Sequence, residues 1–272
     1  MAGRGFRFGV VKAATDAEQW TASARRAAEL GYATLLSPDG MSLLSPLPAL
    51  ATAAAVAPLR VGTFVLAAPL RPAGTVAWEA HSLSVLTGGR FELGIGTGLP
   101  IAADQARALG LPAGSTTQRL EQVRQAVLRL RELDGDRRTP VMIAAGGPKA
   151  VAVAAELADI AALALGPQAG PEDAVALVGQ LREQAGQRAD DIELSLNLFV
   201  VGDTVPEQLQ RFVPVDIETL IARQALTLLR GTPREMADEL QRRRDLLGVS
   251  YVTVNAAFVE QFAPVVELLD GT

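Results

Sequence analysis

The sequence contains no cysteine, one histidine and few aromatic residues. Without cysteine the chain has no disulfide framework, no thiolate metal site and no cysteine nucleophile. Neither a pair of histidines nor a cluster of carboxylates has metal-ligand spacing, so we expect no metal and disfavour a metal hydrolase. Aromatic residues make up only 4% of the chain, which leaves few candidates for an aromatic substrate cage.

Long runs of one charge and long apolar runs are also missing. The chain has 25 basic and 30 acidic residues, a formal charge of −5, and one short basic cluster at 242–244. We interpret that cluster as a solvated helix face and expect no nucleic-acid partner. The alanine-rich run 49–57 is far shorter than the roughly 20 residues of a membrane span. The first residues show no export-signal pattern, so we expect a cytoplasmic protein with no membrane partner.

Short β-branched runs alternate with longer helical patterns along residues 1–272. This alternation predicts an α/β protein, a single (β/α)8 TIM barrel. An open doubly wound sheet is the alternative, but it usually has fewer strands and a glycine-rich turn after the first one, which is absent here. Strands are predicted at 6–11, 33–37, 59–66, 91–96, 140–145, 159–165, 192–201 and 250–255. Helices are predicted to start near residues 17, 46, 75, 116, 148, 171, 216 and 259, with an excursion over 202–216.

The ends of the second and third predicted strands carry unusual residues, and in a barrel the working residues lie at the carboxyl ends of the strands. Asp39 follows the second strand and is either a carboxylate facing a ligand or part of an Asp-Gly turn. Gly62 interrupts the third strand. It indicates a bulge or the close approach of another group, or simply tight packing.

Glycines alternate along the end of the fourth predicted strand. Gly94, Gly96 and Gly98 share one face, whereas Leu93 and Ile95 share the other. If the aliphatic face meets the helices, the glycine face lines the barrel interior and leaves room for a flat ring system. A tightly packed barrel without a ligand is the alternative interpretation.

Two glycines connect the fifth predicted strand to its helix. Gly146 and Gly147 let the backbone approach a ligand, Pro148 suits the first helical turn, and the free N–H groups of the helix can bind a phosphate. Lys149 either adds a positive charge there or faces solvent. His81 lies in the middle of the third predicted helix, away from the strand ends, and we expect it to be a structural residue of the outer helix ring.

Four blocks of the sequence, at 31–39, 59–63, 86–98 and 144–148, together resemble the luciferase-like monooxygenase superfamily. That superfamily includes flavin-dependent monooxygenases and oxidoreductases that use coenzyme F-420, an 8-hydroxy-5-deazaflavin. The blocks cover most of the first 165 residues. Two positions depart from the family pattern: Gly40 stands where a histidine often follows the aspartate, and Leu99 stands where some members have an acidic residue.

The resemblance implies a cofactor ring over the barrel mouth, between the ends of strands two to four, with its phosphate at the glycine pair after strand five. In the deazaflavin branch the residue matching Asp39 helps to hold the ring. The resemblance also leads us to expect a non-proline cis peptide at Phe64–Val65. The implied cofactor-binding residues are Asp39, Thr63, Phe64, Val65, Gly96, Thr97, Gly98, Ala145, Gly146, Gly147 and Pro148.

The resemblance favours an oxidoreductase that transfers hydride between coenzyme F-420 and an unknown small organic substrate. A monooxygenase or reductase that uses FMN is the first alternative, because the same barrel face accepts either ring. A non-catalytic flavin-binding barrel is the second, because the two usual proton donors are missing. Catalytic residues are therefore not assigned from the sequence. The resemblance also implies a homodimer.

Overall fold

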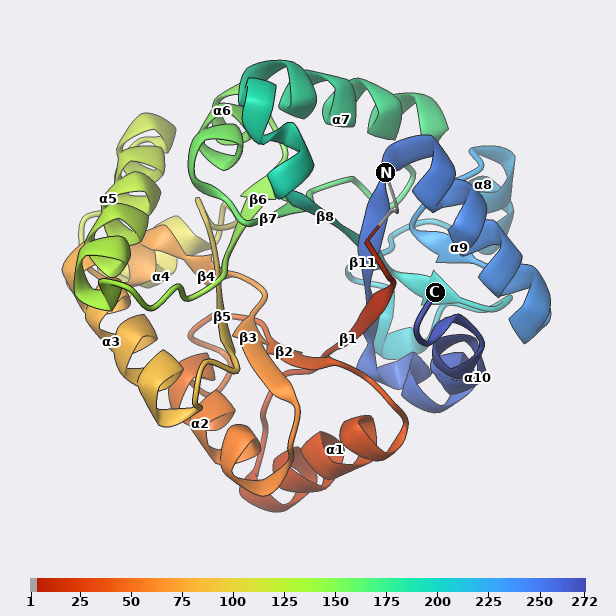
Figure 1. Ribbon diagram of the computed structural model, residues 1–272, viewed down its shortest axis with the longest axis horizontal. Coiled ribbons are helices and arrows are strands. Elements are labelled where there is room, and N and C mark those ends of the chain that lie inside the picture. The colour runs from red at the N-terminus through yellow and green to blue at the C-terminus, as the bar shows by residue number, and fades with distance from the viewer. Residues whose placement is uncertain (1–3) are drawn as a thin grey trace.

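The computed structural model describes residues 4–272 and consists of a closed parallel barrel surrounded by helices (Figure 1). All neighbouring strands pair in parallel, and the barrel closes because β1 pairs with β11 and β3 pairs with β5. The predicted (β/α)8 fold is confirmed. The barrel strands, in order around the ring, are β1 (Arg7–Val11), β2 (Thr34–Ser37), β3 (Arg60–Thr63), β5 (Phe91–Gly96), β6 (Val141–Ala145), β7 (Ile160–Leu163), β8 (Glu193–Leu198) and β11 (Val249–Asn255).

Eight helices of ten residues or more form the outer layer within the described residues. Several begin as their sequence predicts: Asp16 Oδ1 accepts a hydrogen bond from the Gln19 amide at 2.8 Å, and Pro46 and Pro171 occupy first-turn positions. No helix in the described part of the chain is long and apolar enough to cross a membrane. The outer helices are α1 (Ala17–Glu29), α2 (Pro46–Val56), α3 (Ala73–Leu86), α5 (Thr116–Asp134), α6 (Pro148–Leu157), α7 (Pro171–Ala185), α9 (Pro233–Leu247) and α10 (Val259–Leu269).

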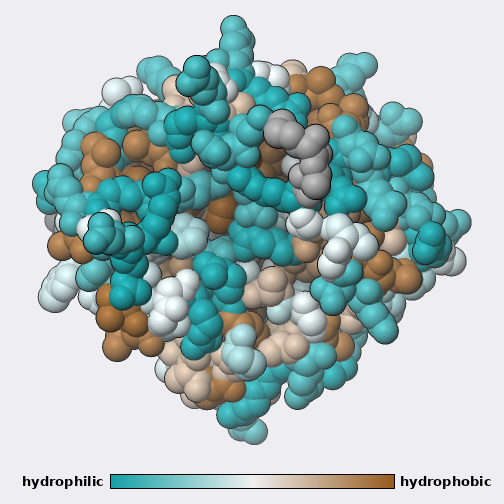
Figure 2. Space-filling model, viewed as in Figure 1, coloured by the Kyte–Doolittle hydropathy of each residue, from teal (hydrophilic) through white to brown (hydrophobic). Residues whose placement is uncertain are grey.

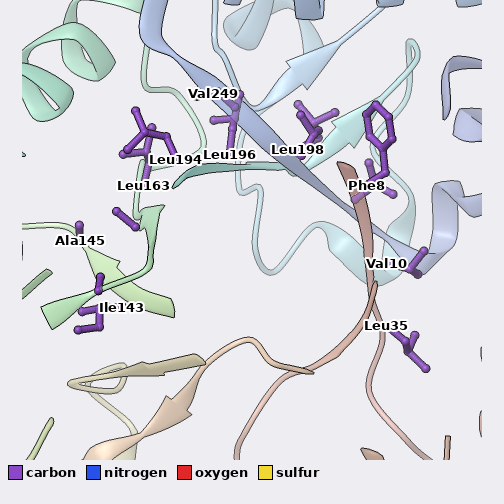
Figure 3. Close-up of a cluster of buried hydrophobic side chains, with 14 of the residues drawn as sticks. Phe8, Val10, Leu35, Ile143, Ala145, Leu163, Leu194, Leu196, Leu198 and Val249 are labelled. Atoms are coloured by element: carbon purple, nitrogen blue, oxygen red, sulfur yellow. The ribbon is translucent and has the colours of Figure 1, made fainter. Parts of the chain in front are cut away.

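Side chains alternate between the helix layer and the barrel interior along each strand. Outward-facing residues form most of the main apolar core; Figure 3 labels ten of its side chains: Phe8, Val10, Leu35, Ile143, Ala145, Leu163, Leu194, Leu196, Leu198 and Val249. A smaller cluster contains Leu36, Met142, Ile160, Ala162 and Tyr251. These five occupy the alternate, inward-facing positions of their strands, so the barrel centre is filled with side chains.

Charged side chains close the end of the barrel at which the strands begin. Glu92 is only 2% exposed and accepts hydrogen bonds from Arg7 and Arg60, each at 2.6 Å. Arg7 also pairs with Glu193 at 2.6 Å and stacks on the Tyr251 ring. Burial alone would lower the pKa of Arg7, but these partners hold it above its ordinary value. This end faces the viewer in Figure 2, where hydrophilic residues cover the centre.

The excursion after β8 is longer than predicted. Asp216 caps a helix as expected, but that helix, α8 (Ile217–Ala222), ends after six residues. The chain then forms β10 (Leu228–Leu229), which pairs with β9 (Val200–Val201), and the helix that packs on the barrel is α9. The barrel helix that was predicted to start near residue 216 therefore starts at Pro233 instead. A capping box between Thr232 and Glu235, with a proline at the first helical position, starts α9.

The basic cluster 242–244 was also misinterpreted in part. Arg243 is 6% exposed rather than solvated. Its guanidinium donates to the carbonyl oxygens of Leu226 at 2.7 Å and Leu228 at 2.9 Å, and its Nε donates to Glu239. Arg243 therefore fastens α9 to the end of the excursion, which a pattern of adjacent charges cannot reveal.

Candidate functional site

The predicted site residues lie at the carboxyl ends of four neighbouring strands. Strand β2 pairs with β3, β3 with β5, and β5 with β6. The loops after these strands therefore form one continuous side of the barrel mouth. The opposite end is closed by the charged residues described above, so a ligand of the barrel reaches it from the mouth.

The third predicted strand is interrupted by a bulge. It is divided into β3 and β4 (Leu66–Ala67), and the peptide Phe64–Val65 is cis, as expected. Gly62 pairs with Glu92 and Leu66 with Ile95, so four steps along this segment match three steps along β5. The bulge therefore contains one extra residue.

Thr63 bridges the bulge to β5. Its hydroxyl donates to the Gly94 carbonyl oxygen at 2.7 Å and accepts from the Gly94 amide at 2.8 Å, in place of backbone bonds between the strands. Thr63 is buried, whereas Phe64 and Val65 are half-buried. The latter two residues form a ledge at the mouth, which we call the bulge ledge.

The glycine face of β5 is not an open groove. A Cβ atom on Gly94 would lie 1.8 Å from the Thr63 carbonyl oxygen, and one on Gly96 would lie 3.1 Å from Val65 and 3.2 Å from Ala144. The prediction that these glycines leave room for a ring was wrong, because the bulge fills that space. Gly98 has a φ of +78° and forms the turn after β5. A ring at the mouth must lie above the bulge ledge.

Asp39 is buried in an ion pair. Its side chain is 2% exposed, and Arg71 binds it through two hydrogen bonds of 2.6 and 3.0 Å. The Ala67 amide donates a third bond of 3.0 Å to the same carboxylate. Arg71 is held in turn by Gln122 of α5, which donates to its carbonyl oxygen. Sequence reasoning missed Arg71, which lies 32 residues from Asp39 in no recognisable motif.

The start of α6 is open. Gly147 occupies the cap position without a side-chain cap, and a Cβ atom there would have no neighbour within 4 Å. Gly146 is close to Ala164, so a side chain at that position would crowd the next loop. Pro148 is the first helical residue, and Lys149 is exposed. An anion can therefore approach the free N–H groups of this helix without displacing any side chain.

His81 lies in the outer helix layer, as expected. Its Nδ1 is 2.8 Å from Oδ1 of Asp134, a buried residue at the end of α5 that also accepts from the Thr139 amide. This pair is at the end of the barrel where the strands begin, opposite the mouth. The loop positions Gly40 and Leu99 carry no titratable group, and no group of three metal-binding side chains lies together within residues 4–272.

Comparison with known proteins identifies the family. The family model described as luciferase-like monooxygenase matches residues 6–246. The chain belongs to this family. No curated protein matches the luciferase-like chain closely enough to count as a relative.

Solved structures with the same fold include both deazaflavin and flavin enzymes. A coenzyme F-420-dependent tetrahydromethanopterin reductase from Methanopyrus kandleri has a TM-score of 0.74 and 16% identity, covering 98% of each chain. The oxygenating constituent of 3,6-diketocamphane monooxygenase from Pseudomonas putida, in complex with FMN, has a TM-score of 0.70 and 12% identity, covering 97% of this chain and 95% of that one. A monooxygenase from Streptomyces bottropensis has a TM-score of 0.72 and 18% identity, covering 96% and 97%. At these identities the likeness concerns the fold.

Proposed function

We propose that this luciferase-like barrel is an oxidoreductase that binds coenzyme F-420 at its mouth and transfers hydride between the deazaflavin and a small organic substrate. The open, glycine-lined start of α6 beside the bulge ledge carries the proposal. The start of α6 offers an anion site and the ledge offers an apolar surface, on the two strands that flank β5. The matching position of Asp39 and the fold shared with the F-420-dependent reductase support the deazaflavin.

The residues present fit the two ends of such a cofactor. Phe64 and Val65 are half-buried and offer an apolar surface to one face of a ring. Gly146 and Gly147 leave the start of α6 free for a phosphate, where the helix dipole favours negative charge. The ion pair of Asp39 with Arg71 fixes the turn after β4, which adjoins the ledge. In this proposal Asp39 holds the ring indirectly, by positioning that turn.

When bound, the deazaflavin would supply the hydride chemistry, and the protein would supply binding, orientation and exclusion of water. Hydride transfer requires that the two reacting carbons are held close and aligned. His81 lies at the wrong end of the barrel to move a proton at the mouth. Because histidine is the side chain whose ordinary pKa is near neutrality and the sequence has no second one, we expect the proton that accompanies the hydride to come from water or from the substrate itself.

A binding titration distinguishes this proposal from the two alternatives. The purified protein is titrated with the oxidised deazaflavin and, separately, with FMN, and each cofactor is followed by its own absorbance. We expect the deazaflavin to bind at least about tenfold more tightly, a difference of about 1.4 kcal/mol. Equal or reversed affinities would favour the FMN enzyme. Tight deazaflavin binding without hydride exchange with any substrate would favour a non-catalytic barrel.

We also propose a homodimer, in agreement with the family resemblance. Helix α3 exposes three large apolar side chains: Trp78 at 67%, Val85 at 45% and Leu86 at 79%. Trp78 and Val85 are seven residues apart on one face of the helix, and Leu86 adjoins Val85, so the three form a stripe that His81 and Ser82 interrupt. Two copies of one stripe related by a two-fold axis can cover each other.

A further inference from the structure

The sequence contains only two asparagines, and both lie at the barrel mouth. Asn197 is near the end of β8, and Asn255 is the last residue of β11. These strands are neighbours in the barrel. Neither residue belongs to the cofactor site proposed above, which involves the ends of β2 to β6.

Asn197 presents unpaired donors at the mouth. It lies between Leu196 and Leu198, which are fully buried and face the helices, so Asn197 faces the barrel interior. Thr253, its register partner on β11, donates its hydroxyl proton to Asn197 Oδ1 at 2.9 Å. The Asn197 Nδ2 group has no hydrogen-bond acceptor among residues 4–272. The carboxamide is therefore oriented by its oxygen, and its N–H groups remain available.

Asn255 repeats this arrangement one layer further out. Its Oδ1 accepts a hydrogen bond from the Ala257 amide at 2.9 Å, and its Nδ2 group also has no acceptor within the described residues. Both side chains are half-buried. Two carboxamides on adjacent strands thus have their oxygens used by the protein and their donors free.

Apart from Thr253 and Ser195, whose hydroxyl has no hydrogen-bond partner within the described residues, the inward-facing side chains around the asparagines are apolar. Val11, Phe64 and Val65 pack on the interior cluster, and Ala144 and Ala162 face inward from β6 and β7. A half-buried amide among such side chains keeps only part of its hydration, and an amide without any hydrogen-bond partner costs free energy. The free donors of Asn197 thus require an acceptor from solvent or from a ligand.

The two asparagines lie across the mouth from the proposed ring position. In the ring of eight strands, β8 is four strands from β3, and β11 is four strands from β5. A ring on the bulge ledge therefore has the asparagines on its far side, where a second molecule would enter. Because this placement uses the ledge, it rests on the proposed function.

We propose that Asn197, supported by Thr253 and joined by Asn255, binds the substrate through an sp² oxygen, and that the substrate is a small apolar molecule with a carbonyl or carboxylate group. Donors without a fixed acceptor nearby select an oxygen that accepts hydrogen bonds. The apolar side chains around them suit a hydrocarbon body. A hydrocarbon of the same shape without the oxygen leaves the amides unpaired and is rejected.

The test uses protein labelled with nitrogen-15 at asparagine only, so that just two of its side-chain amide groups carry the label. The probes are cyclohexanone, cyclohexanecarboxylate and methylenecyclohexane, which share a six-membered ring. We expect cyclohexanone or cyclohexanecarboxylate to shift the Asn197 amide signals saturably and methylenecyclohexane to leave them unchanged. The active probe identifies the group as a carbonyl or a carboxylate. Signals that move with neither oxygen probe, or equally with methylenecyclohexane, overturn the proposal.

Substitutions distinguish the residue that binds the probe, Asn197, from the residue that orients it, Thr253. Asn197→Asp replaces the donors by an acceptor and should weaken binding of the active probe at least about tenfold. Thr253→Val should weaken it as well, and Thr253→Ser should restore it, because only the hydroxyl orients the amide. Gln184→Glu on the exposed surface of α7 adds the same charge and should change nothing. Binding unchanged in both Asn197→Asp and Thr253→Val would contradict the assignment.

The spectra are recorded without cofactor and again with the deazaflavin. Since the asparagines are part of the barrel itself, we expect the oxygen probe to shift Asn197 under both conditions. If the deazaflavin does not bind but the Asn197 signals still respond to the oxygen probe, the proposed cofactor is wrong and the proposed substrate contact is supported. If the deazaflavin binds and the Asn197 signals do not respond to either oxygen probe, only the proposed substrate contact is wrong.

Discussion

Replacing Asp39 tests whether the buried ion pair positions the ring ledge. In Asp39→Ala the Arg71 guanidinium, 17% exposed, loses both carboxylate bonds, and the Ala67 amide loses its acceptor. Removing one partner of a buried pair costs about 3–5 kcal/mol, and because Arg71 retains some contact with water we expect about 3 kcal/mol. For a chain of this size that lowers the melting temperature by roughly 6–12 °C.

The same substitution should weaken deazaflavin binding, because the turn after β4 loses its anchor. We expect about a tenfold increase in the dissociation constant for Asp39→Ala, a loss of about 1.4 kcal/mol. Arg71→Ala should have a similar effect on affinity, since it breaks the same pair. Melting curves and absorbance titrations measure both quantities. A loss of affinity in Asp39→Ala with full affinity in Arg71→Ala would refute the reasoning, because it would mean that the carboxylate contacts the cofactor directly.

Three further substitutions test other parts of the structure. His81→Gln should leave turnover within about threefold of the parent, far from the 10²–10⁴-fold effect of a general acid, and a hundredfold loss with the fold intact would place this histidine at the mouth. Burial would raise the pKa of Asp159, but hydrogen bonds, led by that from Arg138, hold it below its usual value. The ionised carboxylate of Asp159 therefore stabilises the folded protein fully above the unfolded pKa of about 3.9. This contribution is lost as the pH falls below that value. The melting temperature of Asp159→Asn should thus fall less than that of the parent from pH 6 to pH 3, and an equal fall would contradict this. Trp78→Lys should shift sedimentation from dimer to monomer, whereas a dimer of unchanged affinity would place the interface elsewhere.

The barrel and the position of its mouth could be predicted because their signals are local. Strand ends are marked by glycine, proline and Asp39, and the β-branched runs between them alternate with helical patterns. The cis peptide Phe64–Val65 was expected from the family resemblance and not from any local signal.

Contacts between distant segments could not be predicted. The partner of Asp39 depends on how the chain turns after β4, and the space beside Gly94 and Gly96 depends on the path of the bulge. Inspection of the alternating pattern shows that these glycines lack side chains, but not what lies against them. The same limit applies to Asn197, whose importance depends on Thr253, 56 residues later in the chain.

An anion site at the start of α6 is central to the proposed function, and Gly147→Asp tests it most directly. A carboxylate would occupy the space that is empty around Gly147, whereas Gly179→Asp places the same group on the exposed surface of α7 and serves as the control. We expect Gly147→Asp to melt like the parent and to lose measurable deazaflavin affinity, at least about a hundredfold or 2.7 kcal/mol, with no loss in the control. Parent-like affinity in a folded Gly147→Asp protein would contradict the placement of the cofactor phosphate at this helix.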